Sequence, residues 1–182
     1  GVYVLVSLWI DPGHSAEAIA ARVANRLPEY RVVVIYGKYD AVSILEQIAF
    51  STGATDIINM ITPHLTDLEK CRTGLYMKLF PLVREILERC CHEVKRDGDG
   101  RVVAGPLLLV IDDFEQILED PAEDGGFHRV EPGHAETVSA VMAAFESAYN
   151  RTLSRLLITS RHTFTLPRRG GGDAPVVVWG GG

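Results

Sequence analysis

The sequence predicts an α/β fold built around one five-stranded, mostly parallel sheet. Short runs of β-branched and aliphatic residues alternate with longer amphipathic stretches along the chain. The strand-like runs are apolar throughout, which is typical of strands buried on both faces of a parallel sheet. Parallel pairing requires helical connections of this kind. No internal repeat or linker divides the 182 residues, so we expect a single domain over residues 1–182.

The expected elements follow from local signals. The strands are expected at 2–8, 31–36, 107–111, 155–159 and 175–179. The helices are expected at 15–27, 40–50, 75–94 and 135–149. Pro28 ends the first of these helices, and Asp40 can act as the N-cap of the second. Residues 52–73 are expected to form short helical pieces, because Pro63 interrupts them. The stretches expected to be loops are 95–105, 120–133 and 168–173.

Composition disfavours nucleic acid and membranes as partners. The net charge of −6 argues against a basic nucleic-acid surface. No apolar run approaches the roughly 20 residues of a membrane span, and the first residues do not resemble a signal peptide. Cysteines stand only at positions 71, 90 and 91, an odd number without metal-binding spacing, which argues against a disulfide framework. We therefore expect a cytoplasmic protein.

The most informative segment is LLLVIDDFE at 107–115. Five apolar residues form a buried strand, and Asp112 and Asp113 follow at the end where open α/β sheets bind ligands. One carboxylate at this place can hold hydrated Mg²⁺, a cation that prefers oxygen ligands. A second, Asp113 or Glu115, can orient a water molecule for attack on a phosphoryl group. The alternative interpretation is a solvated acidic turn.

A second polar strand end follows about 45 residues later, at LLITSR over 156–161. The strand ends in Ser160 and Arg161. A hydroxyl and a guanidinium at this place can contact a γ-phosphate, or the arginine can cap the sheet edge. Two such motifs in this order, with a helix between them, are more specific than either motif alone.

Together these stretches resemble the nucleotide-binding core of the STAND class of P-loop NTPases, the NACHT and NB-ARC-like domains of bacterial signalling proteins. The resemblance rests on LLLVIDDFEQIL at 107–118, LLITSRHTFTLP at 156–167 and AARVANRLPEYRVVVIYG at 20–37. It implies a three-layer sandwich with strand order 5-1-4-3-2, numbered along the chain. It also implies a switch that binds ATP or ADP with Mg²⁺. The helical and winged-helix domains that follow the core in that class are expected to be absent.

The same resemblance implies roles for individual residues. Asp112 matches the acid that associates with Mg²⁺ in the Walker B motif of the class. Asp113 or Glu115 would polarise the attacking water. Arg161 would occupy the sensor position, next to Ser160 at the nucleotide.

The phosphate-binding loop departs from the pattern of the class. The pattern GxxxxGK[ST] uses glycines to wrap the phosphates, a lysine to neutralise them and a hydroxyl to bind Mg²⁺. Here residues 8–18 read LWIDPGHSAEA. Gly13, His14 and Ser15 are the candidates to replace Gly-Lys-Ser, with Ser15 as the metal-binding hydroxyl, so the lysine is missing. Lys38, after the second strand, is a candidate substitute. We therefore expect weak nucleotide binding and weak or absent ATPase activity.

Two other interpretations stay open. The first is a nucleotide-free scaffold that keeps the NTPase fold and contacts protein partners or a second copy of itself. The missing lysine favours this scaffold, whereas the acidic strand end favours the switch. The second is a zinc-dependent amidase, because WIDPGH at 9–14 resembles the DPGH motif of cell-wall amidases. His14 and Glu17 would then bind zinc, with His64 as a third candidate.

Overall fold

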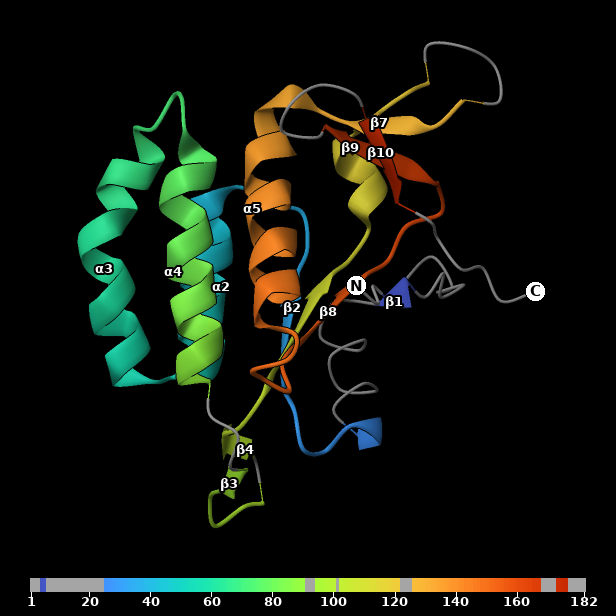
Figure 1. Ribbon diagram of the computed structural model, residues 1–182. Coiled ribbons are helices and arrows are strands. Elements are labelled where there is room, and N and C mark those ends of the chain that lie inside the picture. The colour runs from blue at the N-terminus through green and yellow to red at the C-terminus, as the bar shows by residue number, and fades with distance from the viewer. Residues whose placement is uncertain are drawn as a thin grey trace.

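The computed structural model shows an α/β protein in which helices accompany small sheets (Figure 1). The structure describes residues 4–5, 25–90, 94–100, 102–121, 126–167 and 173–176. Over these ranges there are four α-helices and three sheets. None of the helices in these ranges combines the length and the apolar character that crossing a membrane requires. The α/β class predicted from the sequence is confirmed.

The main sheet is parallel and contains four strands. Their order is β1 (Val4–Leu5), β8 (Arg155–Ile158), β5 (Leu107–Ile111) and β2 (Arg31–Ile35). Strands β2, β5 and β8 form its body, since β1 contributes a pair of residues. Numbered along the chain, the order is 1-4-3-2. The predicted order has the same arrangement for these four strands.

The prediction that residues 175–179 add a fifth strand to this sheet is wrong for the described residues. β10 (Asp173–Val176) pairs antiparallel with β9 (Phe164–Pro167) in a second sheet, and no sheet of the described ranges has five strands. The second sheet also contains β7 (His128–Val130) and β6 (Leu118–Glu119). Only residues 168–172 separate β9 from β10. That length suits a hairpin, whereas a parallel crossover needs about a dozen residues or more.

The helices gather on one side of the main sheet (Figure 1). They are α2 (Ala41–Thr52), α3 (Thr55–Glu69), α4 (Leu75–Arg89) and α5 (Pro132–Ala148). α4 packs along α5, and α3 lies against α2 and α4. The N-cap prediction is confirmed, because the side chain of Asp40 accepts a hydrogen bond from the Ser43 N–H at 2.9 Å.

α3 corrects the prediction of short helical pieces over 52–73. It runs without a break through Pro63, which is exposed on its outer face. Pro63 cannot donate to the carbonyl one turn earlier, but Asn59 at that position is exposed as well, so water can reach its carbonyl. On the inner face Ile57, Ile61 and Leu68 are buried. Burial of that face outweighs the local cost of the proline.

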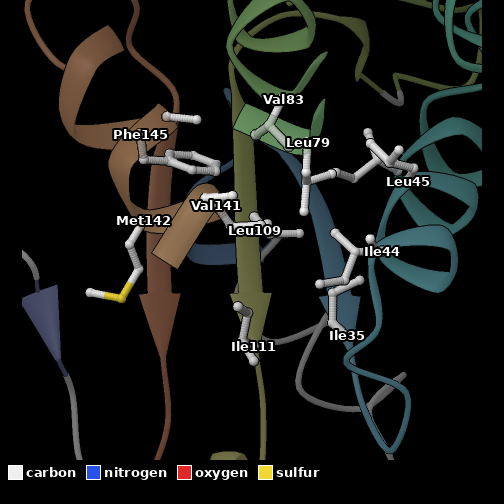
Figure 2. Packing of buried hydrophobic residues seen from close by; sticks show 14 of the residues in the cluster. Ile35, Ile44, Leu45, Leu79, Val83, Leu109, Ile111, Val141, Met142 and Phe145 are labelled. Carbon is white, nitrogen blue, oxygen red and sulfur yellow. The ribbon is translucent and has the colours of Figure 1, made fainter. Parts of the chain in front are cut away.

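The core fills the space between the sheet and the helices (Figure 2). Leu109 and Ile111 of β5 point to the same side as Ile35 of β2, towards Leu79 of α4 and Val141 of α5. The alternate residues of β5, Leu108 and Val110, belong to the opposite face and are buried too. The central strand is therefore covered on both faces, as its continuous apolar run predicts.

Two stretches expected to be loops contain strands. Residues 95–105 hold an antiparallel hairpin of β3 (Lys95–Arg96) and β4 (Val102–Ala104). Residues 120–133 contain β7. Between β5 and β6 the chain forms a short 3₁₀-helix, η1 (Phe114–Ile117). In Figure 1 the hairpin lies at the end of the molecule opposite β7, β9 and β10.

Candidate functional site

The carboxyl ends of β5 and β8 lie side by side and bring together the residues predicted at both strand ends. Strand pairing places Ile111 opposite Ile158. The ladder continues beyond the strands, since the Thr159 N–H donates to the Ile111 carbonyl at 2.9 Å and the Phe114 N–H donates to the Thr159 carbonyl at 3.0 Å. Residues 112–115 and 159–161 therefore form one continuous edge.

Asp112 is held at this edge by hydrogen bonds with two neighbours. Its side chain is largely buried, with the residue 7% exposed. The hydroxyl of Thr159 donates to Asp112 Oδ1 at 2.5 Å, and the Asp112 N–H donates to the Ile35 carbonyl at 2.9 Å. The same Thr159 oxygen accepts the Asp113 N–H at 3.1 Å. One hydroxyl thus ties both predicted carboxylate residues to β8.

Tyr39 fixes the backbone of the two aspartates from the other side. Its hydroxyl lies 2.7 Å from the Asp112 carbonyl and 3.1 Å from the Asp113 carbonyl, and it donates to them. Asp113 has a φ of 55°, and among the described residues it is the one non-glycine with positive φ. A left-handed conformation costs roughly 1 kcal/mol for such a residue. Burial raises the pKa of Tyr39 to about 12, so the hydroxyl stays protonated and continues to donate.

Glu115 and Arg161 form an ion pair across the edge. Arg161 Nε lies 2.5 Å from Glu115 Oε1, with the Glu115 side chain 14% exposed and that of Arg161 79% exposed. Burial acts to raise the pKa of Glu115, but the hydrogen bond and charge of Arg161 outweigh it and hold the pKa below its usual value. The same bond raises the pKa of Arg161. The two side chains predicted to act on water and phosphate thus neutralise each other in this conformation.

Two further side chains at the edge make local hydrogen bonds. The buried Ser160 hydroxyl donates to the His162 carbonyl at 3.0 Å and accepts the His162 N–H at 3.1 Å, which closes a tight turn. The side-chain amide of Gln116 donates to Asp113 Oδ2. Ser160 and Asp113 are therefore at the predicted place, but their polar atoms are engaged within their own turns.

The edge fits hydrated Mg²⁺ through one atom. Over the described residues, Thr159 is the hydrogen-bond donor to the Asp112 carboxylate and it contacts Oδ1, so Oδ2 is the atom left to contact a hydrated ion. A single carboxylate oxygen suits Mg²⁺, which keeps several waters. Over the described ranges no group of three or more His, Cys, Asp or Glu side chains is arranged to hold a metal ion. A complete site therefore needs further ligands from elsewhere.

The other predicted residues fall outside this edge. Gly13, His14 and Ser15 of the phosphate loop, and Glu17 of the amidase hypothesis, lie outside the described residues. His64 is exposed on α3. Lys38 is exposed after β2, the strand that β5 separates from β8.

Sequence reasoning missed Thr159 and Tyr39 as parts of this site. Each of these two residues lies just after a predicted strand, and this position is a signal in the sequence that could have identified it. Thr159 directly follows β8, in the same TSR triplet as Ser160 and Arg161. Tyr39 follows β2, so its hydroxyl can reach the neighbouring strand end.

No protein-family model, no curated protein and no solved structure matches this chain.

Proposed function

We propose that this protein is a nucleotide-binding switch domain that holds ATP or ADP with Mg²⁺ at the carboxyl edge of β5 and β8. The observation that carries the proposal is the place of Asp112. It is a largely buried carboxylate at the end of a central parallel strand, with Oδ1 held by Thr159 and Oδ2 without a hydrogen-bond partner among the described residues. Ligands of open α/β sheets bind at this end.

Each residue at the edge has a chemical role in this proposal. Asp112 holds the water shell of Mg²⁺ through Oδ2, while Thr159 keeps its other oxygen in place. Asp113 or Glu115 orients water, and Arg161 neutralises charge on the γ-phosphate. The phosphate loop around Gly13, His14 and Ser15 supplies backbone N–H groups and the Ser15 hydroxyl.

Binding is expected to be weak, and hydrolysis weak or absent. The missing lysine removes charge-assisted contacts, each of which contributes roughly 1.5–3 kcal/mol. In addition, Glu115 already balances the charge of Arg161, which weakens the attraction of the guanidinium for a phosphate.

The Glu115–Arg161 pair favours a second candidate function, a scaffold without nucleotide. A pair that is already closed satisfies both charges without any ligand. Glu115→Gln separates the two hypotheses. If nucleotide competes with the pair, this variant binds nucleotide more tightly than the wild type, whereas a scaffold is indifferent to it.

Thermal melting tests the proposal. A ligand that binds only the folded state, at ten times its dissociation constant, stabilises by about 1.4 kcal/mol. For a chain of this size the shift is roughly 3–6 °C. We expect such a rise with millimolar Mg-ADP or Mg-ATP, and a rise of at most about 1–2 °C in Asp112→Asn, which keeps the shape and the Thr159 contact but loses the charge. Equal shifts in both proteins, or no shift in either, would contradict the proposal.

A further inference from the structure

Strand β2 forms one edge of the main sheet. In the order β1-β8-β5-β2, it pairs with β5 on one side, and on its other side no strand of the described ranges pairs with it. Helix α2 packs on the face of β2 to which Ile35 points (Figure 2). An edge strand of this kind can accept a further strand through its backbone.

The backbone groups on the outer edge of β2 belong to Val32 and Val34. The Arg31 N–H donates to the Pro106 carbonyl, and the Ile35 carbonyl accepts the Asp112 N–H, both at 2.9 Å, so residues 31 and 35 face β5. Alternate residues of a strand direct their N–H and C=O groups to opposite sides. Val32 and Val34 therefore face away from β5, and no described residue outside the sheet bonds their backbone. These donors and acceptors are available to a further strand.

The sequence of β2 does not protect this edge. Edge strands commonly carry a lysine, a proline or a bulge that prevents pairing with other chains. The segment RVVVI has no lysine or proline, and its register with β5 runs without a shift. Its one charged residue, Arg31, is buried at the start of the strand, and Val32 and Val34 are half-buried. The edge is therefore apolar and regular, as strand pairing requires.

We propose that β2 pairs antiparallel with β2 of a second copy of this chain, about a twofold axis that passes beside Val33. Around this axis, Val32 of each copy lies opposite Val34 of the other, and each such pair exchanges both N–H···O=C bonds. The edge is thus complementary to itself, because the unpaired groups of one copy are those that the other copy needs. The same patch serves on both copies, so the contact gives a closed dimer.

The residues that flank β2 fit the same occupant. Tyr36, directly after the strand, is 55% exposed and comes near Tyr30 of the second copy. Aromatic and β-branched side chains are favourable neighbours across an antiparallel pair. Glu29 and Lys38, both exposed, stand at opposite ends of β2, so antiparallel pairing brings the carboxylate of one copy towards the ammonium of the other. A parallel pair would bring like charges together instead.

This dimer does not depend on nucleotide binding. β5 separates β2 from β8, and the proposed nucleotide site lies at the carboxyl ends of β5 and β8. The dimer can therefore form whether or not the proposed function is correct. A contact of one short strand with its copy is small, so we expect a weak dimer that depends on protein concentration.

Sedimentation equilibrium of the full chain from about 5 to about 500 µM tests the proposal. We expect the average mass to rise with concentration from 20.0 kDa towards twice that value. In Val34→Pro the mass should stay at 20.0 kDa, because proline has no N–H to donate and an edge strand tolerates it at an outward position. Val34→Thr keeps the branched shape and the N–H, so this matched control should dimerise as the wild type does.

Two results of this experiment would overturn the proposal. The first is an equal rise of the mass in Val34→Pro and the wild type. The second is a wild type that stays monomeric over the whole range, which would leave the edge to a strand of another protein.

Residue-resolved hydrogen exchange of the wild type gives a second measurement that needs no variant. The amides of Val33 and Ile35 face β5, so they should exchange slowly at every protein concentration. The amides of Val32 and Val34 should exchange at least about tenfold more slowly at concentrations where the dimer forms than in the monomer. If these two amides keep one rate while the mass rises, the copies associate elsewhere and the proposal is wrong.

Discussion

Thr159→Val probes the hydroxyl that joins the two strand ends. Valine keeps the branched shape of threonine but cannot hydrogen-bond. The wild-type hydroxyl donates to the Asp112 carboxylate at 2.5 Å and accepts the Asp113 N–H at 3.1 Å. A hydrogen bond to a charged group contributes about 1.5–3 kcal/mol, and a bond between neutral groups about 0.5–1.5 kcal/mol. The combined loss is about 2–4 kcal/mol, because Asp112 stays buried without this partner.

Urea unfolding at pH 7 measures this loss, and thermal melting measures it independently. A change of about 3 kcal/mol lowers the melting temperature of a chain of this length by roughly 6–12 °C. The matched control is Thr159→Ser, which keeps the hydroxyl and loses one methyl group, so about 1 kcal/mol or less is expected. If Thr159→Val differs from the wild type by less than about 0.5 kcal/mol, the hydroxyl does not anchor the carboxylates and the reasoning fails.

Three further substitutions test other parts of the account. Tyr39→Phe removes the hydroxyl that holds the Asp112 and Asp113 carbonyls and should cost about 1–2 kcal/mol at pH 7 in urea unfolding. Because the folded pKa of Tyr39 is raised from 10.0 to about 12, the contribution of its hydroxyl to the free energy of unfolding is complete below pH 10 and is lost as the pH rises through 12. An alkaline absorbance titration of the wild type should therefore show one tyrosine that ionises late, and this tyrosine should be missing in Tyr39→Phe. Arg31→Met should be neutral or stabilising by about 1 kcal/mol in urea unfolding. Among the described residues, the buried guanidinium hydrogen-bonds only the Cys90 sulfur, at 3.2 Å, and has no carboxylate partner. A loss of stability above about 2 kcal/mol in this variant would contradict this reasoning. Pro63→Ala should raise the melting temperature, because a proline inside a helix costs up to about 3 kcal/mol relative to alanine, partly offset by its stiffening of the unfolded chain; an unchanged or lower melting temperature would argue against the continuous helix.

Local signals predict strands β2, β5 and β8 and helix α2. The apolar runs at 31–35, 107–111 and 155–158 are dense enough to identify buried strands without tertiary information. Asp40 lies just before an amphipathic stretch and caps it as expected. The order of the four strands in the main sheet was implied by the resemblance to STAND NTPase cores and not by these local signals.

The second sheet could not be predicted, because its strands carry weak patterns of their own. β9 and β10 each contain a proline and few apolar residues. Their local sequence patterns therefore predict a loop or part of a longer strand, and not two paired strands. Their pairing depends on the short connection at 168–172 and on packing such as the contact of Phe164 with Phe114, whose ring centroids lie 4.6 Å apart. The prediction of a break at Pro63 failed for a related reason, because burial of the inner face of α3 outweighs the local helix-breaking effect of the proline.

The candidate site was predictable in composition but not in contacts. The sequence predicts that Asp112 and Arg161 each follow a strand, and the resemblance to STAND NTPase cores implies that these two strands are neighbours. Which side chains meet there depends on the register that sets Ile111 opposite Ile158, and no local pattern specifies it. With that register, the Thr159 hydroxyl reaches the Asp112 carboxylate and Arg161 reaches Glu115. Glu115, which the sequence predicts as a candidate to orient water, is therefore found in an ion pair.

Binding of Mn²⁺ with ADP, followed by electron paramagnetic resonance, tests the central claim most directly. Mn²⁺ prefers the same oxygen ligands as Mg²⁺, and its signal in water falls when the ion is bound. We expect ADP-dependent Mn²⁺ binding by the wild-type chain and an affinity weakened roughly tenfold or more in Asp112→Asn, which keeps the hydrogen bond with Thr159. Equal Mn²⁺ binding by the two proteins, or none by either in the presence of ADP, would contradict a metal–nucleotide site at the end of β5.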